Sequence, residues 1–176
     1  MSLLKFLGIG RTVAGRDAEP ESLRAMTERL DAMAEEEARL AAAYAYLLAR
    51  VAGADLRTDA AERTSIVERL TDFAGLASER AELLADLAIA ANEEHGASDD
   101  HLVARAFRDM TEPPERIRLL RCLYAVAAAD ETITTDEDNE IFEIATAIGI
   151  GRNDVVAVRS AWKAHLGSMK ALPRER

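Results

Sequence analysis

The sequence predicts an all-α fold of about seven helices in one bundle. Half of the residues are hydrophobic (49%), alanine and leucine dominate them, and only 5% of the chain is aromatic, a composition typical of packed helices. Apolar residues recur at spacings of three and four over most of the chain. A segment matches itself 75 residues further along, which indicates two helical units that bury their apolar faces against each other.

The repeat reads Val-Ala-x-Ala-Asp, six residues, Glu, three residues, Ile. Its two copies comprise Val51–Asp55 with Glu62 and Ile66, and Val126–Asp130 with Glu137 and Ile141. The glycines that close the following helices, Gly75 and Gly149, fall one residue out of step. An acidic loop is therefore expected between two helices in each copy.

A long first helix is expected over residues 22–52. Only Glu37 interrupts a heptad series of apolar residues, namely Leu23, Met26, Leu30, Met33, Leu40, Tyr44, Leu47 and Val51. Such a seam packs within its own bundle or associates with a second copy, which would give a homodimer. The acidic run 35–37 marks a place where this helix bends or leaves the core.

Three further helices are expected before residue 111. The pair Asp59 and Glu62 forms a capping box for a helix that ends at Gly75. The next helix begins after Ser78 and runs to about residue 94, and Ser98 caps a short helix through residue 110.

The second half repeats this pattern. Two prolines at 113–114 precede a helix over about 115–129, and a capping box of Thr134 and Glu137 starts a helix that ends at Gly149. Asn153 is expected to cap a last helix that ends near Gly167. The total is seven helices and no strand.

The chain divides into a basic, flexible lead-in (1–20), a helical domain (21–167, with repeats at about 40–94 and 115–166) and a basic tail (168–176). A net charge of −10 argues against nucleic acid as a partner. The basic ends suggest peripheral contact with a membrane or an anionic partner, or they serve solubility alone. A lone cysteine, Cys122, and the lack of a signal peptide suggest a reducing, cytoplasmic location.

The two acidic loops hold the best candidates for a metal site. The first offers Asp55, Asp59 and Glu62, and the second offers Asp130, Asp136, Glu137 and Glu140. Calcium and magnesium prefer several oxygen ligands, and the second loop is richer in them. The alternative is that these acids only cap helices and suit the helix dipole.

Known functional motifs narrow the choice. Counted from Asp130, the second loop has Thr135 where an EF-hand needs glycine and Ile141 where it needs glutamate. No nucleophile and base are paired in the sequence, and no phosphate-binding glycine loop is present, so no enzyme activity is expected.

The segment Ala129–Glu137, followed by Ile141 and closed by Ile148–Ile150, resembles the signature of the tellurite-resistance TerB-like family. That signature is Ala-Asp-Gly-Glu-Ile, a polar turn, a Glu and an amphipathic helix ending near Leu-Gly. Here Glu131 replaces the usual Gly and Thr132 replaces a frequent Glu. The resemblance spans about residues 40–165 and implies seven helices in two pseudo-twofold halves.

The resemblance also implies an acidic site for a divalent cation, with Asp130 and Glu137 in the second repeat and Asp55 and Glu62 as their counterparts. Family members are associated with stress response and tellurite resistance, and similar domains are attached to co-chaperones. We therefore expect a non-catalytic domain that binds a divalent cation. The alternative is a metal-independent scaffold that binds a protein partner through the long heptad helix.

Overall fold

The structure, a computed structural model, describes residues 34–54, 59–95 and 100–167. In these ranges it is all-helical, as expected, apart from an isolated bridge between Ile133 and Leu166. The helices are α3 (Glu35–Ala52), α4 (Ala60–Ala74), α5 (Ser78–His95), α6 (Asp100–Met110), α7 (Pro113–Ala127), α8 (Thr135–Ala147) and α9 (Arg152–Ser160). None of the helices described is long and apolar enough to cross a membrane.

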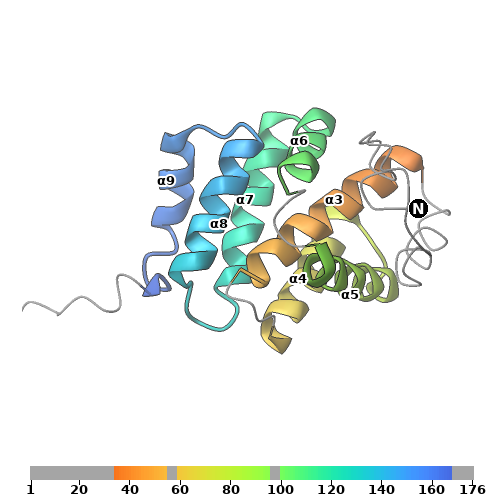
Figure 1. Ribbon diagram of the computed structural model, residues 1–176, viewed down its shortest axis with the longest axis horizontal. Helices are drawn as coiled ribbons and strands as arrows, with labels where there is room; N and C mark the ends of the chain where they lie inside the picture. Colours follow the sequence, from red (N-terminus) through yellow and green to blue (C-terminus); the bar gives the residue numbers. More distant parts are fainter. Residues whose placement is uncertain (1–33, 55–58, 96–99, 168–176) are drawn as a thin grey trace, which may run out of the picture.

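Helix α3 is the centre of the bundle (Figure 1), in contact with α4, α5, α6, α7 and α8. Its many alanines let neighbouring backbones approach closely, and its larger side chains Tyr44, Leu47 and Val51 are fully buried. Tyr44 also packs against Phe107 of α6, with ring centroids 6.3 Å apart. From residue 38 onward most of the heptad seam therefore faces the core, with Leu40 partly buried against it.

The expectation of one helix over 22–52 is wrong at its N-terminal end. Ala34 has an extended backbone (ψ 139°), and α3 begins at Glu35. The acidic run at 35–37 explains this start, because negative charge is favourable in the first turn of a helix and Glu37 breaks the apolar seam. Residues 22–33 lie outside the described part of the chain.

The two repeats adopt corresponding arrangements. Helices α3 and α4 correspond to α7 and α8, and both cross pairs, α3 with α8 and α4 with α7, are in contact, as a pseudo-twofold axis requires. Gly75 and Gly149 follow the second helix of each repeat with positive φ (61° and 80°), which only glycine adopts without strain. Gly75 is itself the C-cap, whereas Gly149 follows the cap Ile148, which accounts for the offset of one residue.

The last helix is shorter than expected. Gly151, not Asn153, is the N-cap of α9, because its carbonyl oxygen accepts hydrogen bonds from the N–H groups of Asp154 and Val155. The helix ends at Ser160, not near residue 167, and the chain turns so that Leu166 forms the bridge with Ile133. Helix α7 likewise ends at residue 127 and not at 129.

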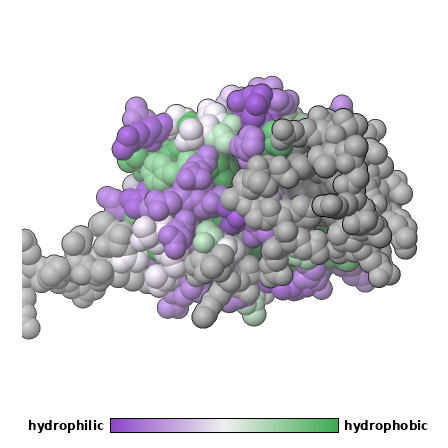
Figure 2. Space-filling view, viewed as in Figure 1, coloured by the Kyte–Doolittle hydropathy of each residue, from purple (hydrophilic) through white to green (hydrophobic). Residues whose placement is uncertain are grey.

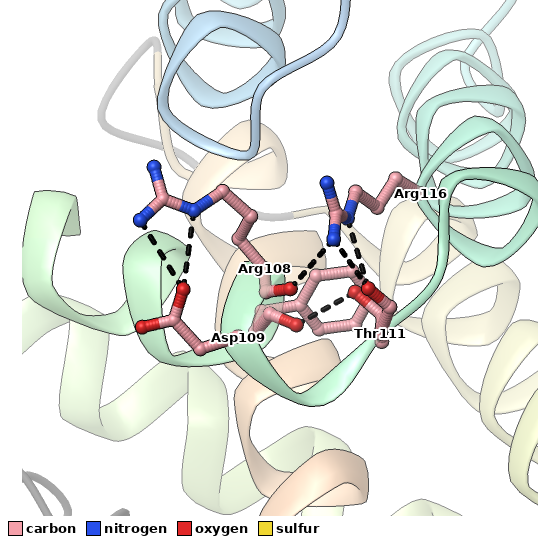
Figure 3. A network of polar contacts seen from close by, with 5 residues as sticks. Arg108, Asp109, Thr111 and Arg116 are labelled. Atoms are coloured by element: carbon pink, nitrogen blue, oxygen red, sulfur yellow. Dashed lines mark hydrogen bonds and ion pairs between the residues drawn. The ribbon is translucent and has the colours of Figure 1, made fainter.

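The turn between α6 and α7 joins the two repeats closely (Figure 3). Arg116 of α7 donates hydrogen bonds to the carbonyl oxygens of Arg108 (2.9 Å) and Thr111 (3.1 Å from Nε). Thr111 is buried, and its hydroxyl donates to the carbonyl oxygen of Phe107 (2.7 Å). These bonds satisfy carbonyl groups that the end of α6 would leave without a partner. The turn is therefore packed as part of the core between the two repeats.

A polar contact fastens α3 to α5 and α8. Arg50 donates to Asn92 Oδ1 (3.2 Å) and pairs with Glu140 (2.9 Å), while Asn92 donates to the carbonyl oxygen of Ala49 (3.3 Å). Asn92 lies so close to Gly53 that a Cβ atom at that position would collide with its amide nitrogen. Glycine in the first copy of the repeat thus leaves room for this contact.

Gly53→Ala is expected to displace the Asn92 side chain and lower the free energy of unfolding by about 1 kcal/mol, because two hydrogen bonds are lost. Chemical denaturation measures this change. Gly151→Ala is the control, since a Cβ there meets nothing closer than 3.6 Å. Equal effects of the two substitutions would contradict this account of Gly53.

Candidate functional site

Two buried glutamates, one from each repeat, meet where the repeats face each other. Glu62 and Glu137 have only 6% and 3% of their surface exposed. Each is the third residue of its helix, α4 or α8, and the expected capping boxes with Asp59 and Thr134 are both present. The cap fixes each glutamate at the start of its helix, and the packing of the repeats then brings the two carboxyl groups together.

Each carboxyl group is held by its own capping box. Glu62 Oε2 accepts a hydrogen bond from the Asp59 N–H (2.8 Å). Glu137 Oε2 accepts from the Thr134 N–H (2.7 Å) and from the Thr134 hydroxyl (2.8 Å). The two carboxyl groups also lie near enough for each to act on the pKa of the other.

The surroundings favour the protonated form of Glu62. Burial, and to a smaller extent the adjacent Glu137, raise the pKa of Glu62 to about 8 against the lowering effect of the Asp59 N–H. Burial also raises the pKa of Glu137, but hydrogen bonds from Thr134, together with the neighbouring Glu62, lower it again. At neutral pH the neutral form of Glu62 is therefore favoured, since two neighbouring buried carboxyl groups do not readily both ionise.

The second acidic loop lies beside this carboxyl pair. Asp130 is exposed, and its negative charge acts on the Glu137 carboxyl, whose pKa it raises. Asp130 Oδ1 accepts from the Thr132 N–H (2.9 Å), and Glu131 between them has a positive φ of 75°. That backbone conformation favours glycine, which explains why the family signature has glycine where this chain has glutamate.

The structure thus joins Glu62, Glu137 and Asp130, which belong to two different loops in the sequence. Asp59 caps α4, and Asp136 is exposed in the first turn of α8. Glu140 pairs with Arg50. The remaining candidate, Asp55, lies outside the described residues.

Sequence reasoning missed a pair of salt bridges with exchanged charges. In each repeat, the residue directly after the capping glutamate forms a salt bridge with the third helix of that repeat. This residue is Arg63 in the first repeat and Asp138 in the second. Arg63 of α4 binds Asp86 of α5 (2.6 and 2.9 Å), and Arg159 of α9 binds Asp138 of α8 (2.6 and 2.9 Å). Tyr124 also donates to Asp138 (3.2 Å). The sequence contained a signal for these two salt bridges, because the equivalent positions 63 and 138 carry opposite charges.

The oxygen donors at this junction fit a hard cation such as calcium or magnesium in type. Their number is small: within the described ranges, no three Asp, Glu, His or Cys side chains are grouped so that they could hold a metal ion. The Asp55 position, which repeats that of Asp130, belongs to the loop before Glu62. Among the described acids at this junction, Glu62 and Glu137 are buried and Asp130 is exposed.

Comparison with known proteins gives one result. A family model described as tellurite resistance protein TerB matches residues 39–160, which is more than half of the chain and includes both capping boxes. No curated protein and no solved structure matches the chain.

The carboxyl pair predicts a pH dependence of stability. The folded-state pKa of Glu62, about 8, lies above its ordinary value of 4.5, so its contribution is fully present below pH 4.5 and is lost as the pH rises through 8. Glu62→Gln keeps the size and polarity of the side chain but does not titrate. Between pH 5 and pH 9, the wild type should therefore lose more unfolding free energy than Glu62→Gln in urea titrations. The exposed Glu79→Gln should follow the wild type, and parallel curves for all three would refute the raised pKa of Glu62.

The positive φ of Glu131 predicts that Glu131→Gly stabilises the fold by up to about 1 kcal/mol, because a residue with a Cβ is strained in this conformation. Asn139→Gly, in the middle of α8, should instead destabilise by about 1 kcal/mol. Thermal unfolding compares the two variants. A loss of stability in Glu131→Gly would show that the side chain of Glu131 contributes more than its backbone costs.

Proposed function

The chain belongs to the tellurite-resistance TerB family, and we propose that it is a non-catalytic domain that binds a divalent cation, calcium or magnesium, where its two repeats meet. The observation that carries the proposal is the contact between Glu62 and Glu137. The process served would be tellurite resistance or a related stress response, in the cytoplasm.

Two buried carboxylates repel each other, and a single proton relieves that repulsion at neutral pH. A divalent cation relieves it better, because its two charges compensate both carboxylates. Asp130, which already acts on Glu137, would add a third negative charge from the surface side.

Burial favours binding over catalysis at this site. With exposures of 6% and 3%, the two glutamates leave no room beside them for an organic substrate, and one oxygen of each is occupied by its capping box. A small ion that enters from the Asp130 loop requires no such room. Asp136, exposed on the same helix start, would contribute to the attraction of a cation, and Glu140 would act only through Arg50.

The proposal predicts that calcium or magnesium raises the melting temperature of chelator-treated protein. At a free concentration of about 100 times Kd, the native state gains about 2.7 kcal/mol. Asp130→Asn and Glu137→Gln should each abolish this gain while the metal-free proteins remain folded.

Glu115→Gln is the matched control, because Glu115 occupies the same third position in the capping box of α7, where its hydrogen bond to the Glu112 N–H is exposed and not buried. This variant should keep the full response to the cation. The absence of a response in the wild type, or a response that survives both Asp130→Asn and Glu137→Gln, would contradict a cation site at this junction.

A further inference from the structure

The acidic loop is fastened to the C-terminal end of the domain through its backbone. The Ile133 N–H donates to the carbonyl oxygen of His165 (2.8 Å), and the Ile133 carbonyl oxygen accepts from the Gly167 N–H (2.9 Å). Ile133 and Leu166 are each only 1% exposed. Residues 161–167, here named the C-terminal strap, therefore share both hydrogen bonds and core packing with the loop that contains Asp130.

A second connection runs through side chains. Asp138 follows Glu137 directly in α8, and it holds Arg159, the last residue but one of α9, through hydrogen bonds of 2.6 and 2.9 Å. These side chains are 15% and 29% exposed, whereas those of the corresponding pair, Asp86 and Arg63, are 53% and 38% exposed. The better buried pair, Asp138 with Arg159, therefore lies next to Glu137 in the sequence and directly before the strap.

The fit between loop and strap is close. A Cβ atom on Gly167 would lie 3.2 Å from the Ile133 carbonyl oxygen and 3.5 Å from Thr132 Cγ2. Thr132 is also the residue whose N–H binds Asp130. A shift of the loop by a fraction of an ångström therefore changes the contacts of Gly167, because close-packed groups do not deform independently.

We propose that the C-terminal strap is coupled to the acidic loop: occupation of the loop holds the strap in place, and release of the strap weakens binding to the loop. The ligand that occupies the loop is taken to be a divalent cation, and in this respect the inference rests on the proposed function. A cation bound to Asp130 and Glu137 fixes the backbone on both sides of Ile133, and Ile133 supplies both hydrogen bonds to the strap. Coupling between binding and docking is then reciprocal, as linkage requires.

The first test needs no metal. Arg159→Met removes the salt bridge before the strap, and Arg63→Met removes its counterpart in the first repeat. In NMR hydrogen exchange, the amides of Ile133 and Gly167 should exchange about tenfold faster in Arg159→Met, the factor for about 1.4 kcal/mol of lost local stability. Arg63→Met should leave both rates unchanged. Asp138→Asn provides a second variant that should resemble Arg159→Met, and unchanged exchange in both would overturn the coupling.

The second test uses calcium or magnesium. Both ions should slow exchange at Gly167 in the wild type, and Arg159→Met should bind them several-fold more weakly than Arg63→Met. Equal affinities in these variants would overturn the coupling even if the cation site is real. If the wild type binds neither ion, the proposed function fails, and the coupling is then judged by Asp130→Asn in metal-free protein: faster exchange at Gly167 supports it and an unchanged rate refutes it.

Discussion

The contact between Glu62 and Glu137 constrains the rest of this structure. Two carboxyl groups lie in the interior at the starts of α4 and α8, and burial together with the neighbouring charge raises the pKa of Glu62 to about 8. Each glutamate also completes the capping box that starts its helix. The starts of α4 and α8 and the relative position of the repeats are therefore linked through one pair of side chains.

The surrounding structure supports that pair from both sides. The alanine-rich helix α3 lets the second helices of both repeats approach it, and its Arg50 reaches Glu140 on α8. Outside the pair, Arg63 and Asp138 fasten α4 and α8 to the third helix of each repeat with opposite polarity. Figure 2 shows hydrophilic side chains interspersed with hydrophobic ones over the part of this face that is not grey. Among the described residues, Val156 of α9 is the single exposed large hydrophobic side chain, so apolar area is mostly used inside the bundle.

Local signals in the sequence predicted the elements, whereas the site depends on long-range packing. The capping boxes at Asp59 and Thr134 and the glycines at 75 and 149 act within a few residues, and the structure confirms all of them. The start of α3 at residue 35 was missed because the apolar spacing continues past a polar interruption. Gly151 was missed as the cap of α9 because its contribution comes from backbone geometry, which composition does not reveal.

The meeting of the two glutamates was not predictable from spacing. The repeat showed that Glu62 and Glu137 hold equivalent positions, but a pseudo-twofold axis places equivalent residues together only if they lie near that axis. The sequence interpretation therefore kept two separate loops, each with its own set of acids. The burial of these two glutamates was equally unpredictable from the sequence. A capping glutamate is ordinarily exposed, and only the packing of the opposite repeat covers these two.

The most direct test of this account is a titration of the side-chain carboxyl carbons of Glu62 and Glu137 by NMR in chelator-treated protein. We predict that the Glu62 carboxyl keeps its proton through neutral pH and titrates near pH 8. A divalent cation should move that titration to lower pH. Titration of both carboxyl groups near the ordinary glutamate value of about 4.3 would show that burial does not hold a proton on Glu62, and the central contact proposed for this domain would then be wrong.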